Sequence, residues 1–537
     1  MAPEDFSLSA SAAAAGGEEL APATRHRGAR SIVTFATGLI YTVTTVLLGF
    51  IATPLLVRWL GDARYGAYRA ALDWFGHFSL LDFGLSGALL PILAAALARE
   101  AHRLPQVLRT AIYAYARMGV FMLLAGTPLA LLLPHLIHVP PAMRGDLIAA
   151  AFVGLAGFLL APFTPFNKLL ETAQSGYWVN LVLLLQACLS IGLALGLAWL
   201  GWGITGQFLA VLAGMLLASL LYAVRARRLL PSGSWGRFFG RPDPQILRQL
   251  RRLQWPAWIL TLSGRVQLFS DNIIVAGLLS PAAVVPFFIT QKLAALGQRE
   301  AQRLSLVSWP ALAEMHARGE MDLFRRRLFE LTRLTSVTGC LLMLPVVIYN
   351  RAFITAWMGV RYYAGMPLTF LAAANAILLA CQSVWSYCIE STGQVRALVP
   401  IGVAQGAFNL AASLLLTWRL GLVGPVLATT LAYLGFTIWY HPLMLRRHFA
   451  VVPWRMHWAM LQPILLAFGL GLASWQWVRF SPPSGLLSAL WQMAIVAAVY
   501  GLLAWVLAFS PAMRRDQSRW LATIAASLRR LGRSRPQ

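Results

Sequence analysis

Three basic side chains recur on one face of the helix that hydrophobicity predicts over residues 283–315. Lys292, Arg299 and Arg303 stand at positions i, i+7 and i+11, and their directions on a helix differ by only about 40°. Cations in such a row could bind an anion and guide it through a membrane. The alternative is that the inner half of this helix lies in water, because its length of about 50 Å exceeds a bilayer core.

A second group combines a cation with carboxylates that could bind a proton or Na⁺. Arg69, Asp73 and His77 follow one another at i+4 steps, which places them on one helix face. The plain alternative is an ion pair between Arg69 and Asp73, with His77 packed beside it. Asp82 and Asp271 are further carboxylates within predicted spans, where a charge is costly unless it is paired or functional.

Three more charged residues complete the candidate set. Arg265 lies about 18 Å into a predicted span, near the bilayer middle, where an unpaired arginine should face water or an anion. Glu171 and Glu390 occupy equivalent inner ends of two other predicted spans, and we expect them to cap or pair across a gate. The four cysteines fall in apolar runs without the spacing of metal ligands, so we predict no metal site.

The composition identifies the class of protein that must hold these charges. Of 537 residues, 58% are hydrophobic and only 12% are charged, and the mean hydropathy is +0.66. Soluble proteins average about 25% charged residues, so a water-soluble multidomain enzyme is excluded. The net charge of +25 does not indicate a nucleic-acid partner here, because the basic residues lie between apolar runs of about 20 residues.

Apolar segments of membrane-spanning length recur along the whole chain. They predict an all-α integral membrane protein with about 14 transmembrane helices. The predicted spans are 31–57, 65–98, 107–133, 145–168, 177–200, 203–226, 253–279, 283–315, 329–350, 365–389, 395–418, 422–445, 457–478 and 484–509.

The basic residues are distributed unequally between the two sides of the predicted membrane. With a cytoplasmic N-terminus, 31 of the 44 Lys and Arg residues lie in cytoplasmic segments, six lie within spans and seven face the other side. This bias predicts that both termini are cytoplasmic.

An internal repeat divides the chain. At an offset of 219 residues, Glu171 aligns with Glu390 and Trp199 with Trp418. Spans one to six and seven to twelve are therefore predicted to be two copies of a six-helix unit, and because six is even both copies have the same orientation. Two parallel lobes that face each other are typical of a transporter. The predicted organisation is a disordered segment 1–30, an N-lobe 31–228, a basic linker 229–252, a C-lobe 253–448, two further spans in 457–509 and a basic amphipathic tail 510–537.

The turn after the first span carries a recognisable motif. Residues 55–68 read LLVRWLGDARYGAY, and residues 80–87 read LLDFGLSG. Both segments resemble the start of bacterial polysaccharide flippases, which belong to the multidrug, oligosaccharidyl-lipid and polysaccharide exporter superfamily. Asp271 and the segment 310–312 (PAL) also look like this family, and the resemblance covers residues 31 to 450.

The resemblance implies a transporter and not an enzyme. Such proteins are expected to move undecaprenyl-diphosphate-linked oligosaccharides from the cytoplasmic to the periplasmic leaflet of the bacterial inner membrane by alternating access. The expected context is O-antigen or exopolysaccharide biosynthesis, with no cofactor except a coupling H⁺ or Na⁺. Expected partners are the lipid-linked oligosaccharide, membrane lipids, a polysaccharide polymerase and a chain-length regulator.

The resemblance also implies roles for the charged residues named above. A diphosphate is a concentrated anion, and its passage through a low-dielectric layer requires fixed cations. The cations predicted to bind it are Arg265, Lys292, Arg299 and Arg303, with Arg69 as a weaker member. The carboxylates predicted to couple an ion are Asp73, Asp82 and Asp271, and the predicted gate residues are Glu171 and Glu390.

Two rival classes remain open. A membrane glycosyltransferase or polysaccharide polymerase usually carries its catalytic acids on a large outer loop, whereas the longest predicted outer loop, 350–364, has none. The predicted outer surface offers only Asp62 and Asp146. A multidrug antiporter of the same superfamily exports mostly cations, for which an acidic cavity would serve better than an arginine-rich one.

Overall fold

The computed structural model is helical throughout the part of the chain that it describes, with no strand there. It describes residues 21–77, 82–99, 101–230, 241–265, 271–511 and 513–515, and only the backbone at 21–32, 77, 99, 101, 255–257, 259–265 and 395–397. Ten helical segments in these ranges are long and apolar enough to cross a membrane. The predicted class, an all-α integral membrane protein, is confirmed.

The first half of the chain contains eight α-helices that correspond to the six predicted spans. Two of these spans consist of two helices each. The helices are α1 (Ala21–Leu60), α2 (Asp62–His77), α3 (Leu85–Arg99), α4 (Leu104–Leu136), α5 (Pro141–Ala156), α6 (Thr164–Thr172), α7 (Gly176–Trp199) and α8 (Gly203–Arg227).

The second half repeats this order and adds two helices. Its fold also includes a short 3₁₀ turn, η6 (Val360–Tyr362), and a π-helical turn, η8 (Tyr433–Thr437). The α-helices are α9 (Pro244–Arg265), α10 (Asp271–Leu278), α11 (Val284–Ala317), α12 (Met321–Trp357), α13 (Met366–Ser391), α14 (Val395–Leu420), α15 (Gly424–Ala432), α16 (Ile438–Phe449), α17 (Pro453–Phe480) and α18 (Leu486–Leu507).

The helix ends repeat at the offset that the sequence predicts. Helix α6 ends at Thr172 and α13 at Ser391, and α7 begins at Gly176 and α14 at Val395. Each pair of ends is 219 residues apart. The helix ends at the junction of the fourth and fifth spans therefore follow the repeat that the sequence predicts.

The two copies differ in where a span is interrupted. The fourth span is broken by the 3₁₀ segment η4 (Gly157–Phe163), whereas its counterpart α13 is continuous. Pro162 and Pro165 lack the N–H that an α-helix needs, which explains the break. The twelfth span is interrupted instead by the π-helical turn η8, whereas its counterpart α8 is regular.

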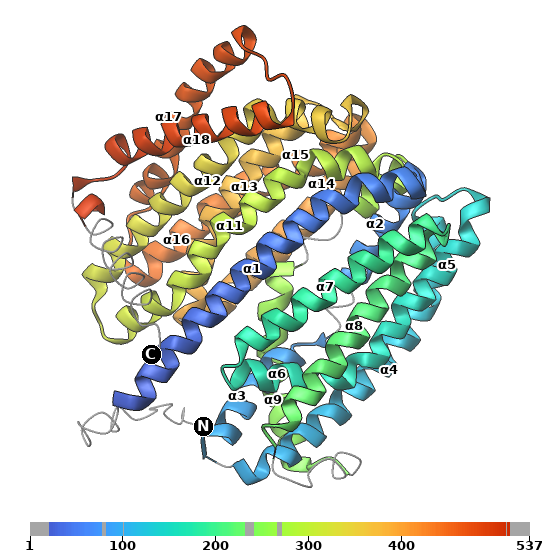
Figure 1. Cartoon of the computed structure of the whole chain (residues 1–537). Helices are drawn as coiled ribbons and strands as arrows, with labels where there is room; N and C mark the ends of the chain where they lie inside the picture. The colour runs from blue at the N-terminus through green and yellow to red at the C-terminus, as the bar shows by residue number, and fades with distance from the viewer. Residues whose placement is uncertain are drawn as a thin grey trace, which may run out of the picture.

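Helix α1 follows the boundary between the lobes. Figure 1 shows it along the side of the molecule between α7 and α11, and it packs closely on α7. Helices α17 and α18 pack on α12. We call the face at which α1 begins the terminal face, and the face at which it ends the far face. The terminal face is the one that the charge distribution predicts to be cytoplasmic.

Small residues on α2 bring the lobes together. Ala67 and Ala70 are fully buried, and they share one apolar cluster with Val275 of α10 and Phe287 of α11. Helices approach closely where such residues replace larger ones. This places the polar residues of α2 next to the second lobe.

Several segment boundaries differ from the predicted ones. Helix α1 begins at Ala21, so it extends into the segment predicted to be disordered, of which residues 1–20 lie outside the described part. Helix α9 begins at Pro244, inside the predicted linker. The predicted amphipathic tail lies almost wholly outside the described residues, which end at 515.

Candidate functional site

A proline in α1 creates an acceptor for the second lobe. Because Pro54 has no N–H, the carbonyl of Phe50, four residues earlier, loses its usual helical partner. The indole Nε1 of Trp357 donates a hydrogen bond to this oxygen at 3.0 Å. The proline turn of α1 is thereby joined to the far end of α12.

Lys292 reaches the same place from α11. Its Nζ donates to the Gly49 carbonyl at 2.9 Å and to Thr53 Oγ1 at 2.8 Å. The ammonium also lies 4.7 Å from the centroid of the Phe50 ring and 4.8 Å from that of Trp357. A lysine in a membrane span loses its hydration. Two oxygen acceptors and two aromatic faces compensate Lys292 for this loss.

Arg303 makes a second contact along the same two helices. Its Nη2 donates to Thr42 Oγ1 of α1 at 3.0 Å, while Lys292 contacts Thr53. Eleven residues separate these contacts on each helix, so α1 and α11 run antiparallel along this line. Arg299 is exposed. Two of the three cations predicted to form a row thus contact α1.

Arg69 of α2 lies on the other side of the lobe boundary from α11. Its guanidinium carbon is 4.1 Å from the centroid of the Phe288 ring of α11, and Lys292 Nζ is 5.9 Å from the same centroid. Within α2, Arg69 pairs with Asp73 at 4.0 Å, the outer limit of an ion pair. Its Nε is buried without a hydrogen-bond partner. The predicted pairing within α2 is present, and the same guanidinium also contacts the second lobe.

Asp73 links α2 to α10. Its Oδ2 accepts a short hydrogen bond from the Asn272 side chain. The neighbouring Asp271 has one carboxylate oxygen, Oδ1, that is buried without a hydrogen-bond partner. The structure thus places Asp73 and Asp271, which are far apart in the sequence, at one lobe contact. Asp73 also pairs with Arg69, which shares the Phe288 ring with Lys292. We call Arg69, Asp73, Asp271 and Lys292 the charged cluster.

The remaining predicted site residues have other neighbours. Asp82 accepts a hydrogen bond from the Ser86 backbone N–H at 3.3 Å, at the start of α3, and such a bond satisfies a free donor at a helix N-terminus. Glu171 pairs with Lys168 of its own helix at 2.8 Å. Glu390 is partly exposed near the end of α13. The side chains of Arg265 and His77 lie outside the described part.

Polar and small residues close the far face. Tyr362 Oη donates to Asp62 Oδ1 at 2.8 Å, and Arg361 stands 3.9 Å from the same oxygen. Gly66 of α2 lies against the Pro281 carbonyl, at the turn before α11. These contacts join the start of α2 to two segments of the second lobe.

The lobes also touch at the terminal face. Leu250 of α9 is buried in an apolar cluster made mainly by α3 and α4. The backbone N–H of Asp243 donates to Thr110 Oγ1 at 3.0 Å. Lobe contacts are therefore present at both faces, with the charged cluster between them.

Sequence reasoning missed the uncharged members of this site. Phe50, Phe288 and Trp357 carry no charge, so within apolar spans they could not be distinguished from packing residues. Asn272 was overlooked beside Asp271. Pro54 could have indicated part of the site, because a proline inside a helix leaves the carbonyl four residues earlier without its helical partner.

Known proteins resemble this chain in sequence or in fold. EpsK of Bacillus subtilis (strain 168), described as an uncharacterized membrane protein, is 24% identical over 443 residues, which cover 77% of this chain and 83% of that protein. A structure titled "Lipid II flippase MurJ, inward closed conformation" superposes with a TM-score of 0.66 at 12% identity, covering 87% of this chain and 98% of that one. An inward-facing multidrug resistance MATE family transporter of the MOP superfamily gives a TM-score of 0.60 at 18% identity, covering 78% and 99%.

A family comparison covers the charged cluster itself. A family model described as "Polysaccharide biosynthesis protein" matches residues 34–316, more than half of the 537-residue chain. The matched region begins inside α1 and ends with α11, so it contains Arg69, Asp73, Asn272 and Lys292. This chain therefore belongs to the polysaccharide biosynthesis protein family.

Proposed function

We propose that this protein flips oligosaccharides linked to undecaprenyl diphosphate from the cytoplasmic to the periplasmic leaflet of the bacterial inner membrane. The family match and the shared fold support a flippase-type transporter of polysaccharide biosynthesis. The observation that carries the substrate class is the pair of cations Arg69 and Lys292, which contact one aromatic ring from opposite lobes.

The physical argument rests on the cost of placing like charges together. Two cations in a low-dielectric interior repel each other, and each has lost part of its hydration. Arg69 has one carboxylate at the outer limit of an ion pair, and Lys292 has neutral oxygen acceptors and aromatic rings. A diphosphate would offer several charged oxygens to both groups at once, with the planar guanidinium suited to two of them.

Binding of such an anion would change the lobe contact. The diphosphate would compete with Asp73 for Arg69, and Asp73 is also hydrogen-bonded to Asn272 of the second lobe. Substrate binding is thereby linked to the contact that holds α2 against α10. The lobe contacts at the two faces would then have to break in turn, as alternating access requires.

We extend the proposal to the other predicted residues. Arg265, Arg299 and Arg303 would guide the headgroup from the terminal face, and Asp73 or Asp271 would exchange H⁺ or Na⁺ as the lobes move. Asp82 also has a buried oxygen, Oδ1, without a described hydrogen-bond partner, but its Oδ2 accepts a hydrogen bond at the start of α3 and no contact with the charged cluster is described for it, so a coupling role is less supported. The polymerase and chain-length regulator remain expected partners, and the protein would act as a transporter without catalysis.

A multidrug antiporter is the second candidate. The neighbouring carboxylates Asp73 and Asp271 favour it, because two partly buried carboxylates at one lobe contact suit exchange of an organic cation for H⁺ or Na⁺. The similarity in fold to a multidrug resistance transporter is consistent with this alternative.

Reconstituted vesicles distinguish the two candidates. The full chain would be tested for translocation of a fluorescent polyprenyl-diphosphate oligosaccharide and, separately, for uptake of a fluorescent organic cation. The proposal expects transport of the first substrate only, and a large loss of it in the double variant Arg69→Ala, Lys292→Ala. Gly192→Ala is a matched control, because no atom lies within 4 Å of the added methyl group. Cation uptake that depends on Asp73, without oligosaccharide transport, would favour the antiporter.

A further inference from the structure

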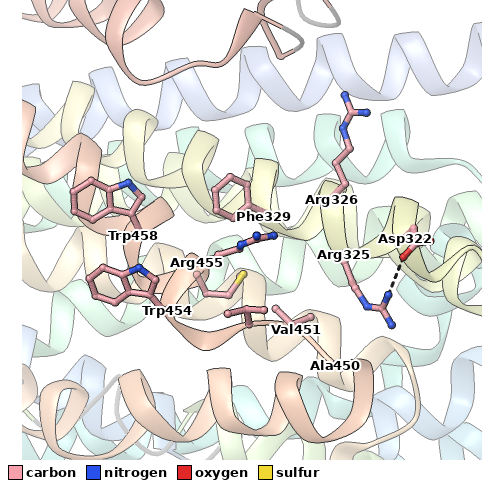
Figure 2. Close-up of a pocket in the computed structure, with 11 residues that line it drawn as sticks. Asp322, Arg325, Arg326, Phe329, Ala450, Val451, Trp454, Arg455 and Trp458 are labelled. Atoms are coloured by element: carbon pink, nitrogen blue, oxygen red, sulfur yellow. Dashed lines mark hydrogen bonds and ion pairs between the residues drawn. The ribbon is translucent and has the colours of Figure 1, made fainter.

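A cavity of about 540 Å³ opens at the terminal face of the C-lobe, away from the lobe boundary. It lies between the first turns of α12 and the turn that joins α16 to α17, as Figure 2 shows. Basic and aromatic side chains line it together with Ala450, Val451 and Met456. Neither the family match, which ends at residue 316, nor the charged cluster between the lobes includes any of these residues.

Arginines dominate the charge of this cavity. Arg325 is held in place, since its Nε donates to the Phe449 carbonyl at 2.8 Å and its Nη1 pairs with Asp322 at 2.9 Å. Arg326 pairs with Glu330 at 3.0 Å, and that carboxylate is shared with Arg327 at 2.6 Å.

Arg455 adds a further charge from α17. It lines the cavity and is exposed, and among the described residues it has no ion pair. The charged residues that line the cavity are three arginines and one carboxylate, Asp322, so the lining carries a net charge of +2 toward a ligand. In Figure 2 the side chain of Arg455 extends away from the two tryptophans, and its guanidinium lies beside Phe329.

Two tryptophans form the other wall. Trp454 and Trp458 stack with ring centroids 6.0 Å apart and planes at 24°, and 67% and 41% of their surfaces are exposed. Tryptophan is enriched where the hydrocarbon core meets the headgroups, since its ring is apolar and its N–H is polar.

The length of α12 places this cavity at headgroup depth. Its 37 residues span about 55 Å, whereas the hydrocarbon core is about 30 Å thick. The helix therefore extends beyond the core, and its first three turns carry Arg325, Arg326 and Phe329. Basic pockets at this depth, between helices on the positively charged side of a protein, suit lipid phosphates.

We propose that this cavity binds the phosphate headgroup of an anionic phospholipid from the leaflet at the terminal face. Arg326 and Arg455 contact the phosphate, Arg325 shapes the floor, and the stacked tryptophans pack against the glycerol and the first acyl carbons. The phospholipid is favoured over the transported lipid diphosphate because the residues that line the cavity come from α12, from the turn between α16 and α17 and from α17, and none comes from the N-lobe. This site is independent of the proposed transport function.

Native mass spectrometry of the purified full chain, with phosphatidylglycerol or phosphatidylcholine added, would test the proposal. The double variant Arg326→Gln, Arg455→Gln should weaken phosphatidylglycerol binding by about tenfold, because each basic residue contributes a separate attraction to the anionic lipid. The control Arg228→Gln, Arg318→Gln removes two exposed charges at the terminal face outside the cavity. It should change binding less than twofold.

The outcomes separate the possible sources of the phosphate. Weaker phosphatidylglycerol binding in the cavity variant but not in the control, with displacement of the bound lipid by excess phosphatidylglycerol, supports the proposal. Equal weakening by the control variant would show diffuse surface attraction and overturn it. If polyprenyl diphosphate displaces the bound phospholipid more effectively than phosphatidylglycerol does, the cavity belongs to the transported lipid. That result would also overturn the proposal. Because oligosaccharide translocation is measured separately, failure of this site does not alter the test of transport.

Discussion

Gly66 on α2 lies against the carbonyl oxygen of Pro281, and a Cβ atom at position 66 would overlap that oxygen. The two residues belong to different lobes and meet at the far face. Backbone atoms on both sides leave no flexible side chain to move away. A glycine at position 66 is therefore needed for the far face to close in this way.

Gly66→Ala is expected to keep the far face from closing and to reduce transport strongly. Spin labels at Arg64 and Val360, which are exposed on opposite lobes, should report a longer or broader distance distribution. The exposed Cys188 would first be replaced by Ser, whereas the other cysteines are buried. In the control Gly192→Ala the distances and the transport rate should match the parent. An unchanged distance in Gly66→Ala would show that the backbone adapts.

Tyr362 provides a second contact at the far face. Tyr362→Phe removes the hydrogen bond from Oη to Asp62, and loss of a bond to a charged acceptor should increase the open population by about tenfold. The same spin-label pair measures this population.

The pH dependence of this contact follows from the tyrosine. Burial, together with the Asp62 carboxylate that accepts its hydrogen bond, raises the pKa of Tyr362 above its ordinary value of 10.0. The contact needs the protonated hydroxyl, so it is complete below the ordinary pKa and is lost only as pH rises through the raised one. The difference between parent and Tyr362→Phe should therefore be the same at pH 6 and pH 9. A difference that disappears within this interval would contradict this assignment.

Trp357 is expected to stabilise α1 where Pro54 interrupts its hydrogen bonds. In Trp357→Phe the Phe50 carbonyl, already without a helical donor because of Pro54, loses its only described partner. An unsatisfied buried carbonyl costs about 1–3 kcal/mol, so Tm should fall by several degrees. Trp199→Phe is the control, because 72% of the Trp199 surface is exposed. If both variants melt at the same temperature, the indole bond does not stabilise the fold.

The offset of 219 residues shows what the sequence could reveal. A sequence repeat can predict where helices begin and end, because helix ends depend on local sequence. The starts of α7 and α14 follow this repeat. The direction of side chains around one helix was less informative about which of them contact another helix. Lys292, Arg299 and Arg303 share a face of α11, but only Lys292 and Arg303 meet a hydroxyl on α1. Which part of a helix face is covered depends on the neighbouring helix. The spacing of residues along one helix does not show which helix packs against it.

The meeting of Asp73 with Asn272 illustrates what the sequence could not reveal. These residues are 199 positions apart, and a lobe contact depends on how two complete units dock. The motif around Gly66 did indicate a tight turn. Its close approach to Pro281 in the second lobe became visible only in the structure.

Asp73 and Asp271 are expected to couple transport to an ion gradient. Asp73→Asn removes the charge that pairs with Arg69, and Asp271→Asn neutralises a carboxylate of which one oxygen is buried without a partner. A neutral amide cannot exchange a proton and binds Na⁺ weakly, so each variant should lose acceleration by an imposed H⁺ or Na⁺ gradient. Vesicles loaded with the fluorescent lipid-linked oligosaccharide would measure this acceleration.

Asp82→Asn separates coupling from stability in the same assay. Asp82 accepts a hydrogen bond from the Ser86 N–H at the start of α3, so its amide variant should lower Tm by the equivalent of about 1 kcal/mol and keep the gradient response. Asp73→Asn and Asp271→Asn should show the opposite pattern, with normal membrane abundance and no gradient response. Full gradient-driven transport by the double variant Asp73→Asn, Asp271→Asn would remove both carboxylates from the coupling mechanism. The membrane potential acting on the charge of the substrate would then be the remaining driving force.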